Sequence, residues 1–77
     1  QIFVGQRNPS RNKLLQLAFA MKLSLRETNR LLQAGGCNEL YCKNRRDAII
    51  IFCIGHGETL QTVDEQLYAF HEDTITE

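Results

Sequence analysis

The residues best suited to chemistry lie near the start of the chain, and they are suited to binding an anion. Six polar and basic side chains surround the only proline of the chain: Gln6, Arg7, Asn8, Ser10, Arg11 and Lys13. Arg and Lys bring positive charge to a phosphate, and amide and hydroxyl groups donate hydrogen bonds to its oxygens. Ser10 or Asn12 is a favourable N-cap, so we expect this cluster at a helix N-terminus, where backbone N–H groups and the dipole attract anions. An ordinary solvated loop would carry the same residues, and this alternative stays open.

Three cysteines and a histidine form a second candidate set, whose members are Cys37, Cys42, Cys53 and His56. Zinc sites use such ligands, usually in pairs on short knuckles. Cys53 instead lies inside the apolar run 48–54, where we expect it to face the core. We therefore predict no metal and no cofactor. An odd number of cysteines without a secretory signal indicates free thiols in a reducing cytosol, so we expect a cytoplasmic protein.

No catalytic set is evident in the sequence. Gly55-His56-Gly57-Glu58 is the nearest approach to a catalytic turn, but a nucleophile beside a positioned base would be needed. The nearest nucleophile, Cys53, is expected to be buried. We predict that the chain is not an enzyme and that these glycines separate two helices.

The helices that position these residues are predicted by apolar spacing and by capping residues. Over 11–21, Leu14, Leu17, Ala18 and Met21 recur at i, i+3, i+4 and i+7 and indicate a buried helix face. Ser24 and Glu27 form a capping box that starts a helix over 25–34. The glycine pair 35–36 ends this helix, because glycine adopts left-handed backbone angles without strain.

The second half of the chain predicts another helix pair. Asn44 is the expected cap of a helix over 45–55, and Thr59 is the expected cap of a helix over 60–71, whose inner face ends with Phe70. Leu40 and Tyr41 are expected to fold back onto the core. Residues 71–77 are polar and acidic, and we expect them to fray.

The apolar run 48–54 fits a buried strand by composition, but an internal comparison favours a helix. A shift of 35 residues aligns Leu14 with Ile49, and Ser24-Leu25 with Thr59-Leu60. Both copies contain an apolar helix, a short break, a Ser or Thr cap and an amphipathic helix. We therefore predict an all-α fold of four helices arranged as two helical hairpins, with the third helix central or in a subunit interface.

Charge divides the chain into two halves. Residues 1–46 hold all nine Lys and Arg and only Glu27 and Glu39, a net charge of +7, whereas residues 47–77 hold seven acids and no Lys or Arg. This asymmetry is typical of a basic nucleic-acid-binding face with an acidic tail. It also fits halves that neutralise each other, within one chain or between two. No apolar run approaches the length of a membrane span, so no membrane partner is predicted.

Residues 5–32 carry a recognisable pattern: a G-x-R-x-P-S loop, a helix with L-x-x-L-A-x-A followed by an apolar residue, and S-L-x-E opening the next helix. This segment resembles the second half of lambda-repressor-like (Cro/Xre-type) helix-turn-helix regulators, and the remainder is similar to a C-terminal extension of some bacterial members. The matching residues, in order, are Gly5, Arg7, Pro9, Ser10, Leu14, Leu17, Ala18, Ala20, Met21, Ser24, Leu25 and Glu27.

The resemblance implies a lambda-repressor-like DNA-binding domain without its first helices, which would precede Gln1. The chain begins with Gln and not Met, as expected of a fragment or a processed protein. Residues 1–34 would form the second half of the helix-turn-helix domain and residues 35–77 a helical extension, together one domain. The implied phosphate contacts are Gln1, Gln6, Arg7 and Asn8.

The sequence therefore leaves two functions as alternatives. The first is a bacterial DNA-binding transcriptional regulator, in which this chain supplies supporting helices and a phosphate-contacting loop. Its partners would be duplex DNA, bound mainly through the phosphate backbone, and a second copy of the chain, since such regulators reach paired half-sites as dimers. The second is a helical protein-interaction or dimerisation module that makes no DNA contact.

Overall fold

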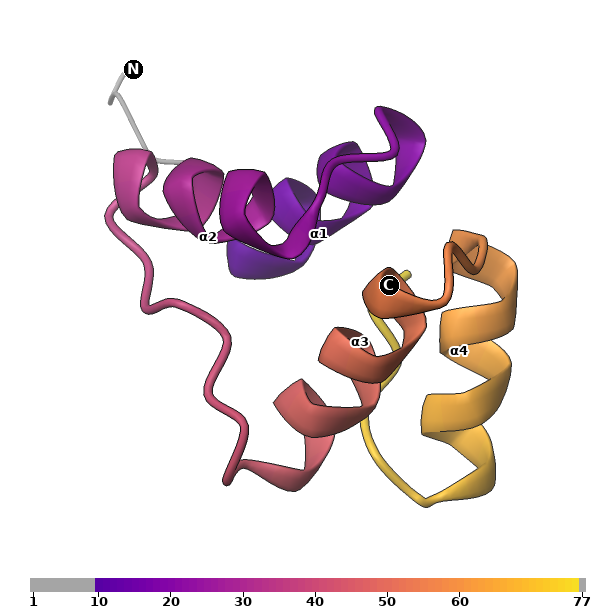
Figure 1. The fold of residues 1–77 in the computed structure, drawn as a ribbon. Coiled ribbons are helices and arrows are strands. Elements are labelled where there is room, and N and C mark those ends of the chain that lie inside the picture. Colours follow the sequence, from indigo (N-terminus) through magenta and orange to yellow (C-terminus); the bar gives the residue numbers. More distant parts are fainter. Residues whose placement is uncertain (1–9, 77) are drawn as a thin grey trace, which may run out of the picture.

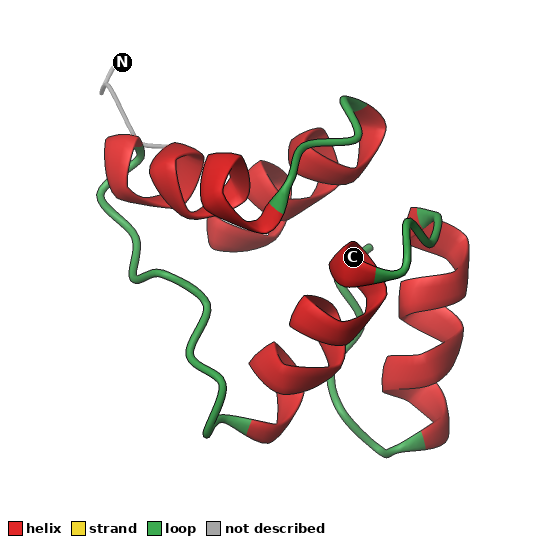
Figure 2. Ribbon diagram, viewed as in Figure 1, coloured by secondary structure: helices red, strands yellow, loops and turns green. Residues whose placement is uncertain are grey.

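The computed structural model describes residues 10–76, and within this range the chain forms helices and no strand. The four helices are α1 (Arg11–Ala20), α2 (Leu25–Ala34), α3 (Arg45–Gly55) and α4 (Leu60–Ala69). They pair as two antiparallel hairpins, α1–α2 and α3–α4, joined by an extended segment (Figures 1 and 2). The predicted all-α fold of four helices is confirmed, with α1 and α4 ending one and two residues before their predicted ends.

Each helix begins directly after a cap residue that the sequence predicts, and of the two caps predicted for α1 the structure uses Ser10. The side chains of Ser10, Ser24, Asn44 and Thr59 accept hydrogen bonds from the backbone N–H groups of Lys13, Glu27, Asp47 and Thr62, respectively. At α2 the capping box is complete, because Glu27 also accepts a hydrogen bond from the backbone N–H of Ser24 at 2.9 Å. These bonds satisfy N–H groups that a helix leaves free in its first turn, so local chemistry fixes where each helix starts.

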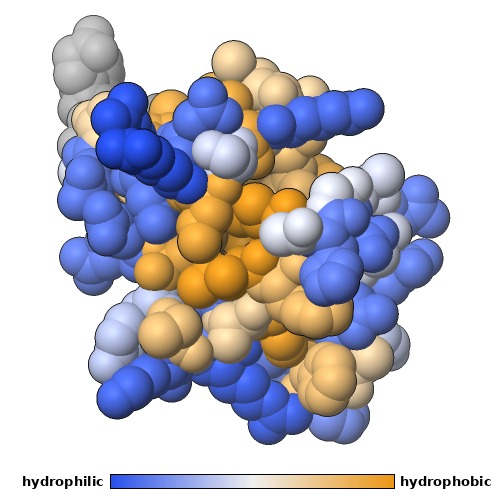
Figure 3. Space-filling view, viewed as in Figure 1, coloured by the Kyte–Doolittle hydropathy of each residue, from blue (hydrophilic) through white to orange (hydrophobic). Residues whose placement is uncertain are grey.

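The core lies between the two hairpins. Among its fully buried side chains are Leu15 and Leu32 from the first hairpin, and Ile50 and Leu67 from the second. The hairpins meet through α1 against α4 and α2 against α3. Apolar surface is visible along this junction, with hydrophilic side chains on both sides (Figure 3).

The similarity between positions 35 residues apart extends to the backbone geometry of the turns. The backbone N–H of Leu23 donates to the carbonyl of Ala18, and that of Glu58 donates to the carbonyl of Cys53, both at 3.0 Å. The turn residue before each of these donors has a positive φ, 55° at Lys22 and 66° at Gly57. The ends of α2 and α4 match in the same way, with φ values of 78° at Gly36 and 62° at His71. The two hairpins are therefore structural copies of one unit.

Each unit ends in a segment that folds back over its own hairpin. Leu40 in the first segment and Ile75 in the second are both buried and 35 residues apart. The backbone N–H of Leu40 donates to Asn29 Oδ1 at 2.9 Å, and that of Ile75 donates to Asp64 Oδ1 at 2.8 Å. Because the same anchor recurs in both units, residues 36–41 and 71–76 are ordered straps of the fold.

The expected fraying of residues 71–77 is therefore wrong for residues 71–76. Besides the Asp64 anchor, the Gln16 amide donates to the carbonyl of Ile75 at 3.0 Å. The prediction of fraying rested on the acidic composition of this segment and overlooked its one apolar residue, Ile75, which is buried in the core. Glu77 lies outside the described residues.

Several large apolar side chains predicted to be buried are exposed instead. Leu17 and Met21 are 46% and 59% exposed, because α1 turns Leu14, Leu15 and Ala18 toward the core. The remaining exceptions are Tyr41 at 58% and Phe70 at 46% exposure. Phe52 of α3 is 63% exposed, so the central position predicted for this helix is wrong, and its alternative position in a subunit interface stays a prediction.

Candidate nucleic-acid interface

The N-terminus of α1 retains part of the predicted anion-binding cluster. Ser10 is exposed, and its Oγ accepts from the backbone N–H of Lys13 at 3.2 Å. Lys13 is exposed, and the first turn of α1 contains no acidic residue. The positive end of the helix dipole and the Lys13 ammonium therefore lie together at the surface. Gln1, Gln6, Arg7 and Asn8 fall outside the described residues.

Arg11 has a different role from the predicted phosphate contact. Its guanidinium donates two hydrogen bonds to the Asp47 carboxylate, at 3.0 and 2.9 Å. It also donates to the carbonyls of Asn38 and Glu39, each at 3.2 Å. Planar guanidinium groups favour such bidentate carboxylate contacts. These bonds direct the side chain into the fold and away from a phosphate at the surface.

Asp47 is the buried centre of this network. The residue is only 6% exposed. Its carboxylate also accepts a hydrogen bond from the backbone N–H of Tyr41 at 3.0 Å, while its own N–H donates to the Asn44 side chain at 2.9 Å. One carboxylate therefore connects the N-termini of α1 and α3 to the strap of the first unit.

Arg46, the counterpart of Arg11, repeats the arrangement in the second unit. It donates to the carbonyls of Asp73 and Thr74, the positions that follow Asn38 and Glu39 by 35 residues. It also donates to Asn12 Oδ1 at 3.0 Å, and Asn12 is the counterpart of Asp47. Each unit thus gives its arginine to the other, as expected of two copies related by a pseudo-two-fold axis.

The opposite charges of the two halves are only partly neutralised within the chain. Arg11 pairs with Asp47, and Arg45 pairs with Glu72 at 3.7 Å. Six other cations have no ion pair among residues 10–76. Arg46 is half-buried and bonds to neutral acceptors, and the other five are exposed: Lys13, Lys22, Arg26, Arg30 and Lys43. Neutralisation within one chain therefore accounts for Arg11 and Arg45 and leaves five exposed cations without an acidic partner among residues 10–76.

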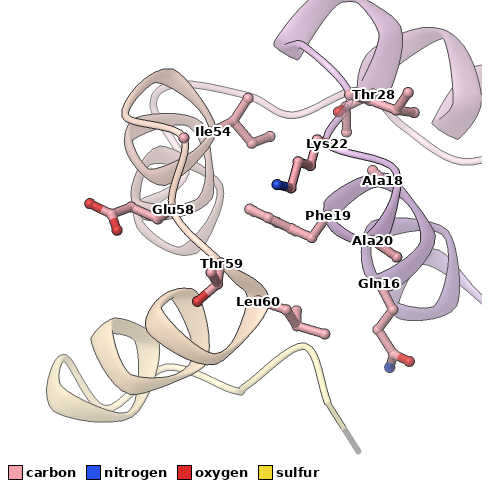
Figure 4. A pocket seen from close by; sticks show the side chains of 12 residues that line it. Gln16, Ala18, Phe19, Ala20, Lys22, Thr28, Ile54, Glu58, Thr59 and Leu60 are labelled. Carbon is pink, nitrogen blue, oxygen red and sulfur yellow. The ribbon is translucent and has the colours of Figure 1, made fainter.

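A groove of about 380 Å³ lies where the corners of the two hairpins meet. Figure 4 shows Phe19 and Ile54, which are 35 residues apart, entering this space from opposite hairpins. The Lys22 ammonium is directed into the space between the hairpins, while the Glu58 carboxylate points away from it (Figure 4). The groove therefore lies across the junction of the two units and has mainly apolar walls with one cation directed into it.

The four residues considered as a candidate zinc set, Cys37, Cys42, Cys53 and His56, are not grouped as a metal site in the structure. No three His, Cys, Asp or Glu side chains in the described part of the chain are grouped as a metal site requires. Cys53 is buried as predicted, Cys37 is half-buried and Cys42 is exposed. Burial, and secondarily the negative charge of Glu58, raises the pKa of the Cys53 thiol. This thiol is therefore poorly suited to act as a nucleophile or a metal ligand.

The polar residues that hold the junction and the straps were not found from the sequence. Arg46, Asn29 and Asp64 make long-range contacts to backbone groups, and such contacts leave no trace in local periodicity. A signal was nevertheless present, because the 35-residue shift also aligns Arg11 with Arg46 and Asn29 with Asp64. Applying that shift to polar as well as apolar positions would have selected these residues.

Comparison with known proteins gives no assignment: no family model, curated protein or solved structure matches the chain. Within residues 10–76, no helix has both the length and the apolar character needed to cross a membrane.

Proposed function

We propose that this chain is part of a DNA-binding transcriptional regulator of bacterial type, acting in the cytoplasm as a homodimer. It would supply the helices that support the recognition helix and a loop that contacts phosphates. The support is the ordered match of residues 5–32 to the lambda-repressor-like pattern, together with two helices that begin at the Ser10 and Ser24 caps of that pattern.

The observation that carries the proposal is the exposed Lys13 in the first turn of α1, a turn that contains no acidic residue of its own. A helix N-terminus with an adjacent cation is a favourable position for a phosphate oxygen. In the proposed contact set, Lys13 binds DNA phosphates together with Gln6, Arg7 and Asn8 of the preceding loop. Gln1 is the remaining proposed phosphate contact. Ser10 caps the helix, and Arg11 holds the hairpins together. These contacts position the protein on the duplex and do not read bases.

A salt titration of duplex DNA binding tests this proposal. The 77-residue chain should shift a duplex at low salt, and binding should weaken steeply as salt rises. Lys13→Ala should lower the slope of log Kobs against log salt by about 0.9, and Arg7→Ala should do the same. Lys43→Ala removes the same charge from the loop before α3 and should leave the slope unchanged. Absence of any shift at low salt would refute DNA binding by this chain.

The second candidate function is a helical interaction module that makes no DNA contact. It is favoured by aromatic side chains on the surface of the second hairpin, since Phe52 and Tyr68 are 63% and 79% exposed. Exposed aromatics are enriched at protein interfaces. Sedimentation of the chain without DNA tests this alternative. A module of this kind would associate with itself in that experiment and would give no shift of duplex DNA in the salt titration.

A further inference from the structure

The outer faces of α2 and α4 are equivalent surfaces of the two units. Each face carries four exposed residues at positions i, i+4, i+7 and i+8. They are Arg26, Arg30, Gln33 and Ala34 on α2, and Gln61, Glu65, Tyr68 and Ala69 on α4. Every α4 position follows its α2 counterpart by 35 residues. The two faces thus share one backbone shape, and Figure 1 shows α2 and α4 on different sides of the fold.

The two faces differ in charge at their centres. Arg30 on α2 corresponds to Glu65 on α4, and neither has an ion pair among residues 10–76. Arg26 adds a second cation one turn before Arg30, and like charges at this spacing destabilise a helix slightly. On the other face, Tyr68 is 79% exposed, the highest value among the large hydrophobic side chains described.

We propose that these faces bind each other between copies of the chain, with α4 of one copy packed against α2 of the next. Three pairings of the two faces can be compared. An α2–α2 contact brings Arg30 against Arg30, and an α4–α4 contact brings Glu65 against Glu65. Only the α2–α4 contact brings opposite charges together, and like charges across an interface oppose association.

The side chains of the α2 and α4 faces complement each other when the two helices run antiparallel. With Arg30 opposite Glu65, Arg26 of one copy lies across from Tyr68 of the other, where a guanidinium can stack on the aromatic ring. Gln33 then lies near Gln61, and the two amides can exchange hydrogen bonds. Ala34 and Ala69 are small enough to let the helix backbones approach. Antiparallel helices also oppose their dipoles favourably.

A contact between two different faces leaves one α2 face and one α4 face free at the ends. Head-to-tail contacts of this type form rings or open chains of copies and not only closed dimers. This inference rests on the second candidate function, the helical interaction module, and names the surfaces through which its copies would associate. It does not depend on DNA binding.

Sedimentation velocity of charge-reversed variants tests the contact. For the 77-residue chain at low salt, the weight-average sedimentation coefficient should rise between about 10 µM and about 1 mM. Arg30→Glu and Glu65→Arg should each lower the association constant by about tenfold or more, because each places like charges across the contact. The neutral variants Arg30→Gln and Glu65→Gln should have intermediate effects.

Restoration distinguishes this contact from misfolding or a general charge effect. Equal amounts of Arg30→Glu and Glu65→Arg chains should associate when mixed, because each then offers the charge that the other lacks. The double variant Arg30→Glu/Glu65→Arg should also recover association. Circular dichroism should show the same helical content in every variant.

Three outcomes would overturn the proposal: a sedimentation coefficient that stays constant up to about 1 mM, single reversals that associate like the wild type, or mixtures that fail to restore association. A loss of DNA binding by Arg30→Glu with unchanged self-association would also overturn it and would assign this face to DNA. Failure of the DNA titration alone leaves the α2–α4 contact intact, because the sedimentation experiments contain no DNA.

Discussion

Arg11 and Asp47 form a bidentate ion pair between the first turns of α1 and α3, with nitrogen–oxygen distances of 3.0 and 2.9 Å. Asp47 is 6% exposed, whereas Asn12, its counterpart in the other unit, is neutral. Of the two arginine contacts related by the pseudo-two-fold axis, Arg11 binds a charged carboxylate and Arg46 binds a neutral amide. The stabilities of the two should differ accordingly.

Arg11→Ala should destabilise the fold more than Arg46→Ala. Removing Arg11 leaves the buried Asp47 carboxylate without its cation, a change that costs about 3 kcal/mol. Removing Arg46 leaves two backbone carbonyls and the Asn12 amide without one donor, which costs about 1 kcal/mol. Urea unfolding of both variants measures the difference, with Lys13→Ala as the control at an exposed position. Equal losses for Arg11 and Arg46 would contradict the assigned charge asymmetry.

Ile75→Ala should destabilise the protein although it lies two residues from the C-terminus of the chain. The side chain is fully buried, and truncating a buried isoleucine costs about 2–5 kcal/mol. Thermal unfolding monitored by circular dichroism measures the loss, and Thr76→Ala is the matched control at the neighbouring exposed position. If Ile75→Ala unfolds at the wild-type temperature, the strap does not contribute to the core.

The Asp64 anchor of the same strap gives a separate prediction. Its carboxylate accepts from the backbone N–H groups of Ile75 at 2.8 Å and Thr76 at 3.3 Å. Asp64→Ala should cost about 1–3 kcal/mol, because a part-buried N–H loses its acceptor. Amide hydrogen exchange at Ile75 should accelerate at the same time. Glu65→Ala, a change in the adjacent exposed carboxylate, should leave that exchange rate unaltered.

The sequence predicted the helices because their signals are local. Caps such as Ser24 and Asn44 bond to backbone groups three residues away, and the similarity between positions 35 residues apart identified α3 as a helix despite its β-branched composition. The straps could not be found in this way. Leu40 and Ile75 are single apolar residues in polar segments, and their partners Asn29 and Asp64 lie 11 residues earlier.

The candidate site was predicted less completely than the fold. Lys13 is exposed at a helix N-terminus as expected, but residue type alone did not distinguish it from Arg11, which turns into the junction. The difference depends on Asp47, 36 residues along the chain, and only the three-dimensional fold brings that carboxylate close. Leu17 and Met21 were misplaced for a related reason, because periodicity does not determine how far a helix rotates against its partner.

The three thiols should react with a maleimide or disulfide reagent in the order of their exposure. Cys42 is exposed and should react first, Cys37 is half-buried and should follow, and Cys53 is buried and should react only on unfolding. The raised pKa of Cys53 acts in the same direction, because less thiolate is present at a given pH. Mass spectrometry of partially labelled peptides gives the order. Early modification of Cys53 under native conditions would contradict its burial.

The raised pKa of Cys53 also predicts how stability changes at alkaline pH. The unfolded thiol ionises at its ordinary pKa, while the folded thiol keeps its proton to higher pH. The corresponding stability is complete below the unfolded pKa and is lost as pH rises through the raised value. Urea unfolding over this range should show the loss in the wild type, and Cys53→Ala should show a smaller pH dependence. Cys42→Ala, which changes an exposed thiol, should behave like the wild type.

Lys22→Gly should maintain or increase stability, although it removes a side chain. Lys22 has a φ of 55°, and the second unit has Gly57 with a φ of 66° at the equivalent position. A left-handed backbone angle strains a residue with a Cβ by about 1 kcal/mol, but glycine has greater entropy to lose on folding. We therefore expect a change between zero and about +1 kcal/mol in the free energy of unfolding. Lys22→Ala retains the Cβ and removes the same charge, so it should be less stable than Lys22→Gly, whereas the reverse order would show that the turn does not require the left-handed angle.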